Sequence, residues 1–209
     1  MTSIDNMLAC QLKARDIDNP GVLRAMYRID RKDFIPEDQL PYSYEDKPLP
    51  IGNGQTISQP YMVAFMTQAM QLSKTDKVLE IGTGCGYQAA VMAQLADRVY
   101  SMEIIDELYQ QARVNLQKAG VTDVYLVHGD GYQGWPKEAP YDAIVLTAAP
   151  PEVPKPLIAQ LKIGGRLLAP VGQRNQKLVL YEKTAPDCLV QKELMNVRFV
   201  PMTGSARGW

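Results

Sequence analysis

Residues 77–90 constrain the fold of this chain more than any other stretch. They begin with a short apolar run that is typical of a buried strand. A tight loop follows with three glycines, and residues 87–95 beyond it are rich in helix formers; the glycines are Gly82, Gly84 and Gly86. Glycine permits a left-handed backbone and the close approach of a ligand, and the first N–H groups of a helix are free to bind that ligand. The stretch therefore predicts a strand, a glycine turn and a helix around a small-molecule site.

The charge around these glycines indicates which cofactor the site takes. Residues 84–89 also fit the loose G-x-G-x-x-A pattern of dinucleotide folds, so the glycines alone do not exclude NAD. Glu80 lies at the strand end, and residues 78–97 contain no lysine or arginine. A carboxylate repels a pyrophosphate but attracts the sulfonium and ammonium groups of S-adenosylmethionine. We therefore predict S-adenosylmethionine as the cofactor; a plain strand-to-helix turn without a ligand is the alternative.

The composition is that of an ordinary globular protein, and it excludes several classes of function. The 209 residues carry a net charge of −1, which gives no general attraction to nucleic acid or to an anionic membrane. Three widely spaced cysteines predict no disulfide framework or zinc cluster, and the single His128 cannot build a multi-histidine metal site. Because no secretory leader or membrane-length apolar run is present, we expect a cytoplasmic protein without a metal ion, a nucleic-acid partner or a membrane anchor.

The order of apolar and polar segments predicts an α/β fold. We expect amphipathic helices at residues 4–14 and from Pro20, a proline-interrupted connection at 34–60, and further helices from Pro60, after a cap at Asp106, and at 154–161. Strands beyond the first are expected at residues 98–103, 124–127, 141–149, 166–171, 177–182 and 195–200. This order predicts a doubly wound, Rossmann-like, mostly parallel sheet with an antiparallel edge and a small N-terminal helical subregion. We expect a single domain over 1–209, with 1–60 contributing to a substrate site and 61–209 forming the cofactor-binding core.

Three polar residues at the ends of these elements are candidate ligands. Glu103 ends the second strand about twenty residues beyond the glycines, where an acid in a doubly wound fold accepts hydrogen bonds from ribose hydroxyls. Asp130, in a turn between two glycines, either accepts from an adenine amino group or stabilises the turn itself. Ser58 shortly precedes the helix that opens at Pro60, so it is a candidate cap for that helix, and its hydroxyl is also a candidate donor to a substrate oxygen in the pocket; both roles are compatible, through the backbone and the side chain.

Several segments together resemble one known family. Residues 55–60, Gln-Thr-Ile-Ser-Gln-Pro, resemble a signature specific to the protein-L-isoaspartate O-methyltransferases, which have the class I methyltransferase fold. The cofactor loop, adenine loop and fourth strand of that family resemble residues 78–90, 129–131 and 141–150, and shorter matches occur at 160–162, 164–165 and 170–172. The resemblance extends over residues 12–201. Its glycine loop is shared widely among methyltransferases, so the segment around Ser58 carries most of the specificity.

The resemblance implies an enzyme that methylates the free α-carboxylate of L-isoaspartyl residues, and less readily of D-aspartyl residues, in damaged proteins. The ester closes to a succinimide, whose hydrolysis returns part of it as normal aspartate. Isoaspartyl peptides and proteins are the implied partners, and a monomer is expected. The resemblance implies Ser58 as the catalytic and substrate-binding residue and Thr203 as a second substrate contact. The implied cofactor-binding residues are Thr56, Ile57, Ser58, Glu80, Gly82, Thr83, Gly84, Glu103, Ile104, Asp130, Gly131 and Thr147.

The chemistry of this reaction agrees with the residues present. A substrate carboxylate is already ionised at pH 7, so no general base is needed and the absence of a catalytic histidine is no obstacle. Three alternatives stay open. The chain is a methyltransferase of the same fold with another carboxylate or small molecule as substrate, a non-catalytic S-adenosylmethionine-binding protein, or an NAD oxidoreductase.

Overall fold

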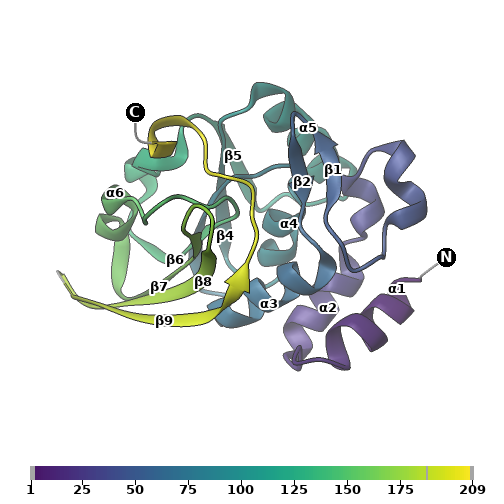
Figure 1. Ribbon diagram of the computed structural model, residues 1–209, viewed down its shortest axis with the longest axis horizontal. Coiled ribbons are helices and arrows are strands. Elements are labelled where there is room, and N and C mark those ends of the chain that lie inside the picture. Colours follow the sequence, from purple (N-terminus) through teal and green to yellow (C-terminus); the bar gives the residue numbers. More distant parts are fainter. Residues whose placement is uncertain (1–2, 187, 208–209) are drawn as a thin grey trace.

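The computed structural model describes residues 3–186 and 188–207, which form a seven-stranded sheet with helices on both faces (Figure 1). The strand order is β5-β4-β3-β6-β7-β8-β9. Strands β3 to β7 run parallel to one another. Strand β8 pairs antiparallel with β7, and β9 pairs antiparallel with β8. The predicted fold class, a doubly wound and mostly parallel sheet with an antiparallel edge, is confirmed.

The element bounds follow the predicted order closely. The strands are β1 (Leu49–Gly52), β2 (Gln55–Ile57), β3 (Lys77–Ile81), β4 (Arg98–Glu103), β5 (Val124–His128), β6 (Tyr141–Leu146), β7 (Leu161–Val171), β8 (Gln176–Ala185) and β9 (Cys188–Val197). The α-helices are α1 (Ile4–Asn6), α2 (Pro20–Arg28), α3 (Pro60–Met70), α4 (Tyr87–Ala93), α5 (Asp106–Lys118) and α6 (Lys155–Ala159). The described residues also contain one π-helical segment, η1 (Met7–Lys13). The short 3₁₀ segments are η2 (Arg31–Phe34), η3 (Glu37–Tyr42), η4 (Gly131–Gln133), η5 (Pro136–Glu138) and η6 (Gly204–Arg207).

Side chains that alternate along the strands pack into separate hydrophobic clusters on the two faces of the sheet. Val78 packs with α3 and α4 on one face, whereas its neighbour Leu79 packs with α6 and the C-terminal segment on the other. Helices α2 and α4 then share a third cluster with η1 and α5. Because both faces are covered, strands β3 and β6 are buried almost throughout, which explains their continuous apolar sequence.

Several element boundaries differ from the prediction. The first helix is a short α1 followed by η1, in which Ala14 N–H reaches back to the Ala9 carbonyl. The predicted cap at Asp106 is wrong, because α5 begins at Asp106 and Ile105 holds the cap position. Strand β7 starts at Leu161, since the glycines at 164–165 lie in an irregularity of the strand and not in a separate turn. Strand β9 spans Cys188–Val197 instead of 195–200.

A β-hairpin that the sequence does not predict lies apart from the main sheet. Strands β1 and β2 pair antiparallel around a turn in which Gly52, Asn53 and Gly54 all have positive φ. In Figure 1 the second strand of this hairpin leads directly into α3. The hairpin forms the end of the proline-rich connection and places residues 55–58 next to the glycine loop, which they join in lining one pocket.

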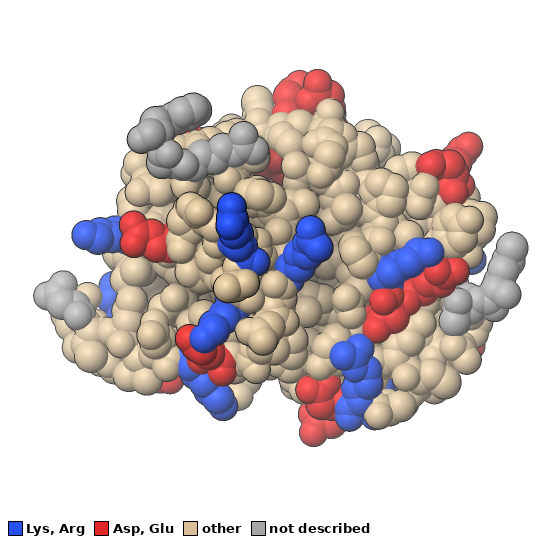
Figure 2. Space-filling model, in the orientation of Figure 1, with Lys and Arg blue, Asp and Glu red and all other residues tan. Residues whose placement is uncertain are grey.

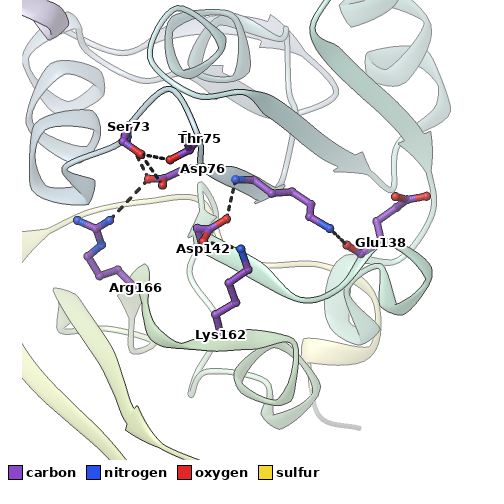
Figure 3. Close-up of polar contacts among 8 residues, drawn as sticks. Ser73, Thr75, Asp76, Glu138, Asp142, Lys162 and Arg166 are labelled. Carbon is purple, nitrogen blue, oxygen red and sulfur yellow. Dashed lines mark hydrogen bonds and ion pairs between the residues drawn. The ribbon is translucent and has the colours of Figure 1, made fainter.

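The amino ends of the central strands are tied together by partly buried polar contacts (Figure 3). Asp142 of β6 accepts hydrogen bonds from the Lys77 N–H of β3, at 2.9 Å, and from the Lys162 Nζ of β7, at 2.7 Å. Asp76, just before β3, accepts from both the N–H and the hydroxyl of Ser73, at 3.0 and 2.6 Å. These contacts fix three neighbouring strands at the end of the sheet opposite to the carboxyl ends.

The surface carries charges of both signs. On the face shown in Figure 2, acidic and basic side chains are interspersed, without a large area of one sign. In residues 3–186 and 188–207, no helix combines the length and the apolar character needed to cross a membrane.

Candidate active site

A pocket opens at the carboxyl ends of the parallel strands, the place where doubly wound folds bind ligands. Its lining includes residues 55–58, 82–85, 102–105, 129–131, 147–148 and 200–203. Apart from Glu80, each residue that the sequence predicts for the site is in this lining. The fold therefore brings together segments that are separated by more than half of the chain.

The glycine loop packs too closely against its neighbours for any larger residue. Gly82 and Gly84 have φ values of 98° and 55°, in the left-handed region that glycine adopts most readily. A Cβ on Gly82 would collide with the hydroxyl of Thr147, and one on Gly84 would lie 3.3 Å from Ile51 in the hairpin. Thr147 in turn donates a hydrogen bond to the Ile81 carbonyl at 3.1 Å. The loop is thus held between the end of β6 and the hairpin.

Glu103 is held at the end of β4 by two backbone hydrogen bonds. Its Oε2 accepts from the Gly84 N–H at 2.8 Å, and its Oε1 accepts from the Ile105 N–H at 3.0 Å. The residue is 5% exposed and lines the pocket. A carboxylate oxygen can accept more than one hydrogen bond, so each oxygen of Glu103 can still accept a hydrogen bond from a ligand hydroxyl. A contact with the ribose hydroxyls stays a prediction.

Glu80 lies outside the described lining, buried beneath the glycine loop. It faces the same side of β3 as Val78, and its Oε2 accepts a hydrogen bond from the Ser101 hydroxyl at 2.5 Å. The Ser101 hydroxyl also lies 2.6 Å from the Thr83 hydroxyl in the loop. Burial raises the pKa of Glu80 to about 8, against the opposing effect of the Ser101 hydrogen bond. The side chain therefore acts on the pocket from below and through Thr83, and direct cofactor contact stays a prediction.

Asp130 both stabilises its own turn and holds the C-terminal segment. Its Oδ1 accepts from the Tyr132 N–H at 2.9 Å, and its Oδ2 accepts from the N–H and hydroxyl of Ser205, at 2.9 and 2.7 Å. Burial favours a higher pKa for Asp130, but these hydrogen bonds outweigh it and lower the pKa. The residue also lines the pocket beside Gly131. The turn-stabilising interpretation is therefore correct, and an adenine contact through the remaining lone pairs stays a prediction.

Ser58 lines the pocket at the end of the hairpin. Helix α3 begins at Pro60 with Gln59 in the cap position, and its Tyr61 N–H donates to Asp46 at 3.2 Å. Asp46 thus takes the role that the capping interpretation gave to Ser58. The Ser58 carbonyl accepts a hydrogen bond from Arg31 at 3.0 Å, which fixes the main chain of the residue. The structure favours the second interpretation, in which the hydroxyl serves the pocket.

The charge of the lining fits a cationic nucleoside cofactor. Among the lining residues, Glu103 and Asp130 carry carboxylates and none is a lysine or an arginine. Ile81, Met102 and Ile104 supply apolar surface beside Glu103, which suits an adenine ring next to a ribose. A pyrophosphate would find no counter-charge here, whereas a sulfonium and an ammonium group would. These residues fit S-adenosylmethionine.

Four residues that support the site were not predicted. Arg31 and Asp46 hold the segment around Ser58, Asn115 donates to the Cys85 carbonyl at 2.9 Å within the glycine loop, and Ser205 binds Asp130. Each acts on a backbone group or on a side chain far away in the sequence. No local motif marks such residues, so only the folded arrangement identifies them.

Comparison with known proteins shows similarity over the whole described chain. The family model for protein-L-isoaspartate(D-aspartate) O-methyltransferase matches residues 3–207. A protein-L-isoaspartate O-methyltransferase from Picosynechococcus is 48% identical over 203 residues, which cover 97% of this chain and 91% of the relative. Protein-L-isoaspartate O-methyltransferase 2 from Pelobacter propionicus is 50% identical over 205 residues, with coverage of 97% and 91%.

Solved structures give the same result. A protein-L-isoaspartate O-methyltransferase structure superposes with a TM-score of 0.90 and 33% identity, covering 98% of this chain and 67% of the other. A structure from Plasmodium falciparum, described as a protein-L-isoaspartate O-methyltransferase in complex with S-adenosyl-L-homocysteine, superposes with a TM-score of 0.86 and 25% identity, covering 97% and 99%.

Proposed function

The chain belongs to the protein-L-isoaspartate(D-aspartate) O-methyltransferase family, and on this basis we propose that it methylates the free α-carboxylate of L-isoaspartyl residues in damaged proteins. D-aspartyl residues are the poorer substrate. The methyl ester then closes to a succinimide and so starts the return to normal aspartate. One observation carries this proposal most directly: Ser58, from the family-specific segment, lines the same pocket as a glycine loop and two carboxylates without a basic side chain.

Each part of the pocket has a distinct task in this reaction. S-adenosylmethionine supplies an electrophilic methyl group when bound. Glu103 accepts from the ribose hydroxyls, and Ile104, Asp130 and Gly131 surround the adenine. Ser58 donates a hydrogen bond from its hydroxyl to one oxygen of the substrate carboxylate, so that the other oxygen faces the methyl group. The C–O bond forms as the S–C bond breaks, and no residue has to take up a proton.

The remaining predicted residues complete this assignment. Thr56, Ile57, Gly82, Thr83, Gly84 and Thr147 shape the cofactor side of the pocket, and Thr203 contacts the substrate. The rate enhancement then arises from alignment of the carboxylate oxygen, methyl carbon and sulfur, with water excluded by the hairpin and the C-terminal segment.

A pair of peptides that differ only in one linkage tests the proposed substrate. The enzyme is incubated with radiolabelled S-adenosylmethionine and either an isoaspartyl peptide or its normal aspartyl twin. We expect label to enter only the isoaspartyl peptide, and the label to be lost on mild alkaline treatment because it is an ester. Equal labelling of the two peptides, or none of either, would reject this substrate. Binding of S-adenosylhomocysteine without transfer to any peptide would instead favour a non-catalytic cofactor-binding protein.

Substitution of Ser58 tests its assigned role. Ser58→Ala removes the hydroxyl that orients the substrate carboxylate, so we expect kcat for the isoaspartyl peptide to fall about 10- to 100-fold, as for the loss of one aligning contact. The affinity for S-adenosylhomocysteine, measured by calorimetry, stays within about twofold because Glu103 and the glycine loop are unchanged. Thr75→Ala, in the polar network at the opposite end of the sheet, serves as the matched control. Full activity of Ser58→Ala would show that the role is misassigned.

We also propose that the protein works as a cytoplasmic monomer on peptide and protein substrates, without a nucleic-acid partner or a membrane. The interspersed surface charges and the net charge of −1 support this, since they give no general attraction to polyanions. Light scattering in solution, compared with the chain mass of 23.3 kDa, tests the monomer.

A further inference from the structure

Arg31 is a fully buried arginine whose hydrogen bonds all go to backbone carbonyls. The residue is 1% exposed. Its Nη1 donates to the Ser43 carbonyl at 2.7 Å, and its Nη2 donates to the carbonyls of Lys47 and Ser58, at 3.2 and 3.0 Å. One guanidinium therefore binds three backbone carbonyls of the proline-rich connection, and the third of them belongs to Ser58, which lines the pocket.

Burial of the Arg31 charge costs free energy. Arg31 takes part in none of the ion pairs formed by the described residues, and its Nε is buried there without a hydrogen-bond partner. Burial lowers the pKa of Arg31, which reflects the cost of removing the cation from water. An apolar side chain of similar volume would avoid that cost but would leave the carbonyls of Ser43, Lys47 and Ser58 without this donor. The three directed hydrogen bonds are what an apolar side chain cannot supply.

Asp46 binds the residues that follow Ser58. Asp46 Oδ1 accepts from the Tyr61 N–H at 3.2 Å, and Oδ2 accepts from the Gln59 amide at 3.4 Å and from Arg15 at 3.0 Å. Ser58 therefore lies between a donor that fixes its carbonyl and an acceptor that fixes the following turn.

We propose that Arg31 is a positioning residue that sets the place of the Ser58 hydroxyl in the active site, by holding the Ser58 carbonyl together with those of Ser43 and Lys47. This inference rests on the proposed function of Ser58. Arg31 acts through the main chain and touches neither substrate nor cofactor. A lysine at this position keeps the charge but has no planar fork, so it cannot hold three carbonyls in one fixed arrangement.

A double-mutant cycle tests this role. Arg31→Lys is made in the native protein and in Ser58→Ala, and kcat for the isoaspartyl peptide is measured with saturating S-adenosylmethionine. We expect Arg31→Lys to lower kcat about 10- to 100-fold in the native background, the range for a small misplacement of an aligning group. In Ser58→Ala we expect a further loss of less than about twofold, because the hydroxyl that Arg31 positions is already absent. A purely structural role would lower kcat by the same factor in both backgrounds, and that result would overturn the proposal.

Arg166→Lys is the matched control, since Arg166 donates to the Gln71 carbonyl at 3.2 Å at the opposite end of the sheet. We expect this variant to keep native kcat. Hydrogen–deuterium exchange supplies a readout that needs no activity: Arg31→Lys should speed exchange in peptides covering residues 43–61, whereas Arg166→Lys should not. Native exchange in that segment would overturn the role of Arg31 alone. Native kcat in Ser58→Ala would overturn the role of Ser58 as well, which separates the two failures.

Discussion

Glu80 shows how one residue can couple the site to pH. It is completely buried, one of its oxygens binds Ser101, and the other has no hydrogen-bond partner in the described chain. A carboxyl group in such surroundings prefers the neutral form, which is why the pKa rises to about 8. A cation entering the pocket above it would favour the ionised form again. The sequence predicts an electrostatic role for Glu80, and direct contact of its side chain with the cofactor stays a prediction.

The raised pKa predicts a specific dependence of stability on pH. Between its ordinary value of 4.5 and about 8, the folded state holds a proton on Glu80 that the unfolded state has lost. Stability therefore falls as pH rises through this window, on the order of 1 kcal/mol per pH unit. Glu80→Gln does not titrate, so we expect the melting temperature of the native protein to fall relative to that of this variant from pH 5 to pH 8.

The control for this experiment is Glu107→Gln, on the exposed surface of α5. Its melting temperature should follow that of the native protein at each pH. If the curves of the native protein and Glu80→Gln run parallel, Glu80 has an ordinary pKa in the folded state.

The residues that the sequence predicted are those marked by a local pattern. Gly82, Glu103 and Ser58 stand at fixed places relative to a strand end or a helix start, so spacing alone indicates where they lie. Arg31 and Asp46 have no such mark. Their partners are a carbonyl and an N–H group some fifteen to thirty positions away, brought together only by the fold.

At the scale of elements, prediction succeeded where burial imposes a pattern and failed where it does not. Strands β3 and β6 are buried on both sides, so their sequences are continuously apolar. Strand β9 is exposed along most of its length, and its polar residues 191–193 interrupt the apolar pattern, so the predicted start was wrong. The hairpin of β1 and β2 was missed because prolines interrupt it and its strands have only four and three residues.

Asp142 joins three strands, and its removal should destabilise the sheet. Asp142→Asn loses the charge that binds Lys77 N–H and Lys162, so we expect the free energy of unfolding at pH 7 to fall by about 1–3 kcal/mol. Burial favours a higher pKa for Asp142, but the contacts with Lys162 and Lys77 outweigh it and lower the pKa below 3.8. The stabilisation is thus complete above pH 3.8 and is lost as pH falls through the lower value in the folded state. Denaturant unfolding should show the difference shrinking in acid.

Glu193→Gln provides the comparison, because Glu193 forms an ion pair of similar length with Lys177 in which both side chains are about half exposed. Its loss should change the free energy of unfolding by less than about 1 kcal/mol. Equal effects of the two substitutions would mean that burial does not strengthen the Asp142 contacts.

The C-terminal segment should contribute to cofactor binding as an element. Gly204 has φ of 71°, and a Cβ there would lie 2.7 Å from both Asp130 Oδ2 and Ile104 Cδ1. Gly204→Ala should therefore displace this segment and weaken S-adenosylhomocysteine binding about tenfold in calorimetry, for a cost of about 1–2 kcal/mol. Gly120→Ala, with φ of 67° and open space around it, carries the same backbone cost and should leave the affinity unchanged. Equal affinities in both variants would remove the segment from the cofactor site.

At the scale of the whole molecule, structural anchoring and ligand binding lie at opposite ends of the strands. The partly buried polar contacts of Asp76 and Asp142 fix the amino ends of the sheet (Figure 3), and the pocket occupies the carboxyl ends. The loops around the pocket can therefore meet the needs of the reaction while the opposite end keeps the strands in register.

Cofactor binding should stabilise the whole molecule, and charge should decide which cofactor does so. At a concentration one hundred times its Kd, S-adenosylhomocysteine adds about 2.7 kcal/mol of stability, or roughly 5–10 °C in melting temperature. NAD should cause no shift, because its pyrophosphate meets two carboxylates and no basic side chain in the described lining. A thermal shift with NAD and none with S-adenosylhomocysteine would contradict the electrostatic assignment of the pocket.

The contribution of residues 200–203 to the pocket has a consequence for synthesis. This segment is anchored by hydrogen bonds between Ala149 and both Val200 and Met202, next to the end of β6. A nascent chain can form the glycine loop and the hairpin while its later residues are still inside the ribosome, but the last wall is then missing. We therefore expect methyl transfer to begin only after residues 200–203 have emerged from the ribosome and completed the pocket.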